Sequence, residues 1–173
     1  IEPVSTLQVM GRGANGALVP ISLSGHHVSA PKATGTVKFS GNLSSTEASQ
    51  TISGVKVIDA KGVEHALSLV FTSQDDTTPG RWKVDLTDGT TNVGSAALDF
   101  VGGIPKAGAE KLSFKYTPKG LAEMTVVMDF SSEVTSYASG TLSTLAAGSQ
   151  DGYVAGSLSS YAFDAKGVLQ FQY

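Results

Sequence analysis

Two runs of alternating residues flank a turn in the stretch Ser53-Gly-Val-Lys-Val-Ile-Asp-Ala-Lys-Gly-Val-Glu-His-Ala-Leu-Ser-Leu-Val-Phe71. Successive side chains of a β-strand point to opposite sides, so His65, Leu67, Leu69 and Phe71 share one face. The turn, Asp59-Ala-Lys-Gly62, has an Asp that can bond nearby backbone and a Gly that can adopt a left-handed conformation. The stretch therefore predicts a β-hairpin.

The same alternation recurs in Trp82–Leu86, Leu112–Tyr116 and Met124–Phe130. Turn signals separate these runs, among them Thr78-Pro-Gly80 and Gly102-Gly103. No comparable helical period is found, because Ser, Thr, Gly and Val dominate. We therefore expect an all-β protein with little helix. Its predicted core residues occupy the apolar phase of their strands: Leu69, Phe71, Trp82, Val84, Leu112, Phe114, Val126 and Met128.

Composition argues against several partners. The 173 residues include 12 Lys and Arg and 15 Asp and Glu, a net charge of −3, and no basic stripe of the kind that binds phosphates. We therefore expect no nucleic-acid partner. The absence of cysteine excludes disulfides, thiolate metal sites and a Cys nucleophile. No apolar run approaches the roughly 18 residues that span a bilayer, so no membrane insertion is expected. Both ends resemble cuts, which predicts a fragment of a longer protein.

One segment matches a dinucleotide-binding pattern. Gly11-Arg-Gly-Ala-Asn-Gly16 fits G-x-G-x-x-G, but an extended run with Pro20 follows it instead of the helix that would hold a pyrophosphate. A hairpin loop at Asn15-Gly16 is the favoured interpretation. The repeated sequence Asp-Ala-Lys-Gly-Val, at 59–63 and 164–168, likewise predicts two hairpin turns, since it lacks the alternating carboxylates of a calcium loop.

Other candidate chemistry is sparse. The three histidines, His26, His27 and His65, are expected at the surface, because adjacent imidazoles on a strand point to opposite faces and cannot share a metal. No G-x-S-x-G elbow is present, and the carboxylate pairs Asp75-Asp76 and Asp85 with Asp88 lie in or near turns where charge is solvated. We expect no catalytic, cofactor-binding or metal site, and a protein that is not an enzyme. The aromatic residues could instead stack sugars on an exposed face: Trp82, Tyr116, Tyr137, Tyr153, Tyr161 and Tyr173.

The last part of the chain carries a resemblance to a known family. Gly152-Tyr-Val-Ala-Gly-Ser-Leu158, an alternating strand, the turn Asp164-Ala-Lys-Gly167 and a second strand resemble the bacterial flagellar hook protein. Further similarities follow in the family's order: Gln8–Ile21, then Ala33–Ser45 ending in Asn-Leu-Ser-Ser, then Ser53–Phe71, then Arg81-Trp-Lys-Val84. The chain is shorter in its middle than the family and lacks the family's terminal helical segments.

This resemblance implies an outer β domain, residues 34–130, inserted into an inner β domain made of residues 1–33 and 131–173. It also implies a flexible tubular joint that transmits torque from the flagellar motor to the filament, located outside the cell. Partners would be copies of the chain in a helical tube and the adjoining rod and hook–filament junction proteins. Without the terminal segments the chain is expected to be monomeric.

Other functions fit the same sequence. A flagellar rod protein is the alternative within the family, although the hairpin at 53–71 is not expected there. A β-sandwich binding or adhesin module would show clustered exposed aromatic side chains at alternate strand positions, and a hydrolase would depend on a single Asp or Ser.

Overall fold

A computed structural model describes residues 9–21 and 25–173. The described chain contains strands and turns and no helix, so the predicted all-β class is confirmed. No helix that could cross a membrane is present in that part of the chain. The chain divides into two compact units, a larger one of Ala30–Ala155 and a smaller one formed by Ile1–Ser29 and Gly156–Tyr173. The larger unit is thus an insertion within the sequence of the smaller.

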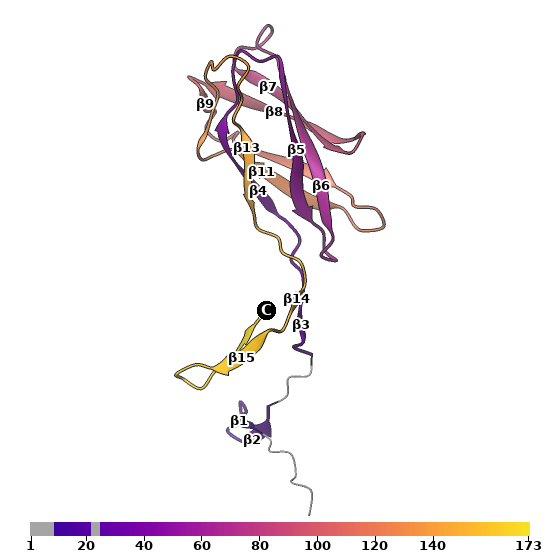
Figure 1. Ribbon diagram of the computed structural model, residues 1–173, viewed down its shortest axis with the longest axis vertical. Helices are drawn as coiled ribbons and strands as arrows, with labels where there is room; N and C mark the ends of the chain where they lie inside the picture. Colours follow the sequence, from indigo (N-terminus) through magenta and orange to yellow (C-terminus); the bar gives the residue numbers. More distant parts are fainter. Residues whose placement is uncertain (1–8, 22–24) are drawn as a thin grey trace, which may run out of the picture. The chain divides into compact units, whose positions relative to one another are not determined.

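The larger unit contains an antiparallel meander of five strands, drawn in the upper part of Figure 1. Each strand pairs with the next along the chain, and the predicted turns at Asp59–Gly62, Thr78–Gly80 and Gly102–Gly103 connect them. The strands are β5 (Ser49–Ile58), β6 (Glu64–Ser73), β7 (Arg81–Asp88), β8 (Thr91–Val101) and β9 (Ile104–Pro105).

A second sheet of the larger unit is organised around β4 (Thr36–Asn42). This strand runs parallel to β11 (Met124–Asp129) and to the short β12 (Val134–Thr135). It is antiparallel to β13 (Ala146–Gln150), and β10 (Lys111–Tyr116) forms the edge beyond β11. Parallel pairs require long connections, and here the whole first meander lies between β4 and β11 in sequence.

Apolar side chains of both sheets form one core. All eight predicted core residues are buried, with Leu112 the most exposed at 7%. The ring of Phe130 stacks on Phe39 at a centroid distance of 4.7 Å and meets Phe71 edge to face at 6.0 Å, so it joins the two sheets. Period-two alternation therefore identified the correct face of each strand.

Residues 131–155 belong to the larger unit, whereas the sequence predicted a boundary at 130. The physical reason is burial: Val134 and Leu145 are each only 4% exposed within the core of the larger unit. Strand β13 also hydrogen-bonds to β4. The compact units therefore divide near 29 and 155, not at 33 and 130.

The smaller unit consists of three two-stranded pairs in its described part. They are β1 (Met10–Arg12) with β2 (Leu18–Pro20), β3 (Val28–Ser29) with β14 (Gly156–Ser157), and β15 (Ser160–Phe163) with β16 (Leu169–Gln172). Tyr161 and Phe163 are about half exposed. We expect from the sequence that Tyr153, Leu158, Tyr161 and Phe163 pack against Leu7–Met10, and this expectation falls partly on Leu7 and Gln8, which lie outside the described residues.

Candidate functional site

Two chain passages, residues 30–35 and 151–155, lie at the two ends of the larger unit. Lys32 and Tyr153 form an antiparallel bridge between them. Each of these residues donates its backbone N–H to the carbonyl of the other, with N···O distances of 2.9 Å. The two passages are therefore held together by backbone hydrogen bonds.

Asp151 secures the first passage to the second. Its Oδ1 atom accepts the backbone N–H groups of Gly35 and Thr36 at 2.8 Å, and its Oδ2 atom accepts Nζ of Lys32 at 3.0 Å. Partial desolvation would raise the pKa of Asp151, but the bonds from Thr36, Lys32 and Gly35 outweigh it and lower the pKa to about 2. The carboxylate is therefore ionised at neutral pH, and it bonds to three groups of the first passage: the Lys32 ammonium and the N–H groups of Gly35 and Thr36.

Thr34 joins the same passage to the meander. Its side chain is almost fully buried, and Oγ1 accepts the backbone N–H of Ile58 at 2.9 Å and donates to Gln150 at 2.8 Å. The backbone N–H of Thr34 donates to the carbonyl of Ile58 at 2.8 Å. The entering chain is thus bonded both to the end of β5 and to the end of β13.

The turn that follows β5 has the predicted geometry. Oδ1 of Asp59 accepts the backbone N–H groups of Lys61 and Val63 at 2.8 and 3.0 Å, and Gly62 has a φ of 82°. Its sequence repeat has the same arrangement, in which Oδ1 of Asp164 accepts two backbone N–H groups and Gly167 has a φ of 76°. Both copies are turns, as the sequence predicted.

The two turns differ in what lies beside them. A Cβ atom placed on Gly62 would be 2.9 Å from Cβ of Pro31 and 3.4 Å from the backbone nitrogen of Ala155, one residue from each chain passage. A Cβ atom on Gly167 would have no neighbour within 4 Å. The tip of the β5–β6 hairpin therefore packs directly against both passages.

His65 is not the surface histidine that the sequence suggested. Its Nε2 atom lies 2.8 Å from Oδ2 of Asp59, and its ring meets Tyr116 edge to face at 5.6 Å. Desolvation would raise the pKa of Asp59, but the bond to His65 and the backbone bonds of the turn lower it. His65 therefore stabilises the turn through its hydrogen bond to the Asp59 carboxylate. In the smaller unit, the ring of His26 stacks on Phe171 at 4.7 Å.

Asp85 and Asp88, one of the two carboxylate pairs considered from the sequence, each bond to neighbouring side chains. Asp85 forms an ion pair with Lys83 and accepts a hydrogen bond from the Ser95 hydroxyl. Asp88 accepts a hydrogen bond from the Tyr116 hydroxyl at 2.9 Å. Within residues 9–21 and 25–173, no three His, Cys, Asp or Glu side chains gather closely enough to hold a metal ion. Gly11 and Arg12 of the dinucleotide-like motif lie in β1, and Gly13–Gly16 form the turn into β2, so the hairpin interpretation is confirmed. An extended strand and not a helix follows the motif at residues 18–20.

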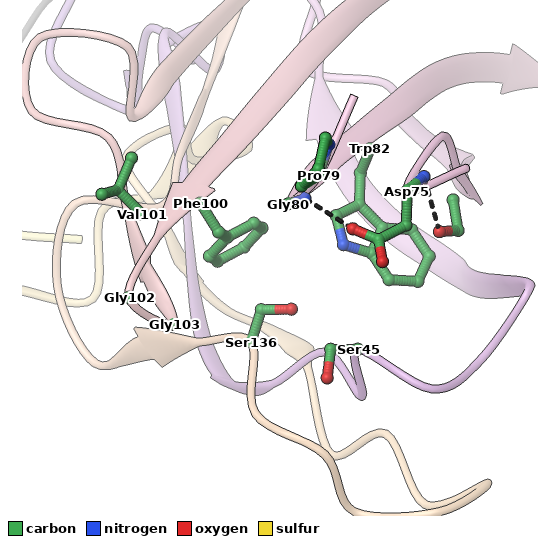
Figure 2. Close-up of a pocket in the computed structure, with 11 residues that line it drawn as sticks. Ser45, Asp75, Pro79, Gly80, Trp82, Phe100, Val101, Gly102, Gly103 and Ser136 are labelled. Carbon is green, nitrogen blue, oxygen red and sulfur yellow. Dashed lines mark hydrogen bonds between the residues drawn. The ribbon is translucent and has the colours of Figure 1, made fainter. Parts of the chain in front are cut away.

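A cavity of about 400 Å³ opens beside the β8–β9 turn (Figure 2). Trp82 and Phe100 form its apolar wall, and three serines and Asp75 contribute polar groups. Oδ1 of Asp75 accepts the N–H of Gly80 at 2.6 Å, which fixes the adjoining turn. Trp82 is only 2% exposed and Phe100 6%, so neither ring offers the flat surface on which a sugar stacks.

Three residues have structural roles that the sequence did not predict. Asp151 and Thr34 were assigned none, and no local pattern marks Asp151, because the N–H groups that it accepts belong to Gly35 and Thr36, far away in the sequence. Asn42, at the end of β4, was assigned no role either. Its amide donates to the carbonyl of Tyr137 and accepts the Tyr137 N–H and the Thr135 hydroxyl, so it holds the 135–144 loop to β4.

No known protein-family model matches the chain, and no curated protein is detectably similar to it.

Proposed function

We propose that the chain is the middle portion of a structural subunit of the bacterial flagellar hook, a tubular joint that transmits torque from motor to filament. Its partners are copies of itself in a helical tube and the adjoining rod and junction proteins, outside the cell. The observation that supports this most is the inserted β unit with two paired chain passages. A tube that bends while it rotates needs subunits whose rigid parts tilt as bodies while their cores stay intact.

The interior of the larger unit fits this role. Its two sheets share a core that includes Phe71 and Phe130, and no buried side-chain polar atom in the described residues lacks a hydrogen-bond partner. Such a unit resists internal deformation. Bending is then concentrated in the connections between units, which is what a joint requires.

A deletion experiment tests the proposal. The coding sequence is removed from the bacterium that encodes it, and purified hook–basal bodies are examined by electron microscopy, with a plasmid copy as the complementation control. We expect rods without hooks, and hooks restored by the plasmid. Normal hooks in the deletion strain refute the proposal, and bodies that lack the rod as well indicate a rod protein instead.

A further inference from the structure

The cavity beside the β8–β9 turn exposes polar atoms that have no partner within the protein. Ser136 lines this cavity and is only 8% exposed, and its hydroxyl forms no hydrogen bond with any described residue. The indole N–H of Trp82, another lining residue, likewise donates to no group in the described part of the chain. Every fully enclosed side-chain polar atom of the described residues does have a partner. The Ser136 hydroxyl and the Trp82 N–H must therefore be open to the cavity.

Among the described residues that line the cavity, Asp75 has the one charged side chain. Its Oδ1 atom accepts the N–H of Gly80 at 2.6 Å, while its Oδ2 atom accepts no hydrogen bond from a described residue. No Lys or Arg is among these lining residues. The Ser136 hydroxyl points to the side of the cavity that Trp82 and Asp75 occupy in Figure 2. The charge of the cavity therefore favours a cation and repels an anion.

The walls of the cavity are apolar enough to hold a hydrocarbon stem. The rings of Pro79, Trp82 and Phe100 line it, together with the exposed side chain of Val101. Its volume of about 400 Å³ and its few convergent polar groups are typical of sites for small molecules or single side chains. A ligand that fits must therefore combine an apolar stem, a cationic donor and a neutral acceptor.

We propose that this cavity binds an arginine residue of a peptide. The guanidinium donates to Oδ2 of Asp75, because the planar fork of its N–H groups suits a carboxylate. The methylene stem packs between Trp82 and Phe100. A peptide carbonyl beside the arginine accepts the Trp82 N–H and the Ser136 hydroxyl, the two groups that lack a partner. The site lies within the larger unit and does not depend on the proposed hook function.

Nuclear magnetic resonance tests the site, because Trp82 is the only tryptophan of the chain and its indole N–H gives a single isolated signal. The isotope-labelled protein is titrated with Nα-acetyl-arginine N-methylamide, which has the guanidinium, the stem and the flanking carbonyls of an arginine residue. The matched probe is the citrulline analogue, in which an uncharged urea of the same shape replaces the guanidinium. Methyl glucoside is the third probe and represents a sugar.

Two variants and one control identify the groups that bind. Asp75→Asn removes the charge but keeps an acceptor for the N–H of Gly80. The control is Asp76→Asn, since Asp76 is the next residue, is exposed and is not among the residues that line the cavity. Ser136→Ala removes the buried hydroxyl. The dispersion of the other amide signals verifies that each variant is folded.

We expect the arginine probe to shift the Trp82 signal saturably at millimolar concentration, and the citrulline probe to bind about tenfold more weakly. Asp75→Asn should weaken binding of the arginine probe by about the same factor and Ser136→Ala by about threefold or more, while Asp76→Asn should change it by less than about twofold. The proposal is overturned if the arginine probe leaves the signal unmoved or if the two probes bind equally. Equal weakening by Asp75→Asn and Asp76→Asn, or saturable binding of the glucoside alone, also overturns it.

Discussion

The carboxylate of Asp59 lies 2.8 Å from Nε2 of His65, six residues further along the chain. The repeat of this turn has a related contact, in which Oδ2 of Asp164 accepts Nε2 of Gln170 at 3.3 Å, also six residues on. In both turns, the Asp side chain therefore bonds to a side chain at the same position of the following strand. The partner is the imidazole of His65 in the buried turn and the amide of Gln170 in the exposed turn.

This comparison predicts how His65 can be replaced. His65→Gln keeps a donor within reach of Asp59 and is expected to lower the free energy of unfolding by less than about 1 kcal/mol. His65→Leu leaves a carboxylate that is only 3% exposed without its side-chain partner, and the expected loss is about 1–3 kcal/mol. Urea denaturation at pH 7 measures both. Equal losses in the two variants show that packing, and not the hydrogen bond, is what His65 contributes.

Removing the charge of Asp151 should change how stability depends on pH. The pKa of this group in the folded protein is about 2, below its ordinary value of 3.8, so the folded state binds fewer protons than the unfolded state between these values. Its contribution is fully present above about pH 4 and is lost as the pH falls toward 2. Asp151→Asn should therefore flatten the stability profile in this window, as followed by thermal melts.

A matched experiment separates this effect from general acid denaturation. Asp75→Asn removes a carboxylate whose acceptor bond can be kept by the amide oxygen and which lies away from the chain passages. The slope of this variant between pH 4 and 2 is the reference against which the slope of Asp151→Asn is compared. If Asp151→Asn gives the slope of the parent protein, the low pKa of Asp151 does not stabilise the fold.

Truncating a core ring should be costly. Phe71 is fully buried and contacts Phe130 across the two sheets, so Phe71→Ala is expected to lower the free energy of unfolding by roughly 3–5 kcal/mol. Val63→Ala is the control, since Val63 is half exposed and should lose less than about 0.5 kcal/mol. Chemical denaturation measures both, and a loss below about 1 kcal/mol for Phe71→Ala contradicts the assigned core.

Hydrogen exchange should distinguish the two units. Every buried apolar residue of the described chain lies between Val37 and Leu145, in the larger unit. An isolated two-stranded hairpin is marginally stable in water. We therefore expect amides of β15 and β16 to exchange through openings of only about 1–2 kcal/mol. Amides of β6 and β7 should require about 5 kcal/mol or more. Equal protection of both sets would show that the units unfold together.

Local patterns were sufficient for much of the fold. Leu69 and Phe71 were placed correctly because a strand buried on one face requires alternation, and Asp59 and Asp164 because an Asp-x-x-Gly turn bonds within itself. The position of β4 between β11 and β13 could not be predicted, since nothing in a strand's sequence specifies a partner so far along the chain. For the same reason the hydrogen bond from the Thr36 N–H to Asp151 and the contact of Gly62 with Pro31 could not be predicted.

The end of the larger unit at Ala155 was not predicted, for a related reason. Val134 and Leu145 lie in a stretch rich in Ser, Thr and Gly with weak alternation, so sequence patterns gave no sign that these two side chains enter the core. His65 was expected at the surface because the three histidines cannot share a metal, although its phase in the strand, shared with Leu67 and Leu69, indicated the inner face. The carboxylate of Asp59 resolves that conflict, and it could be recognised only once the turn geometry was known.

The central position of β4 has a consequence for how the protein acquires its structure. Strands β5 to β9 pair only with their neighbours in sequence, so this meander can form as soon as residue 105 has left the ribosome or an export channel. Strand β4 emerges earlier but has no partner until β11 and β13 follow it. Closing such long loops slows folding. Until then β4 is an unpaired strand, open to pairing with other chains, and a chaperone that covers residues 36–42 would protect the protein during this interval.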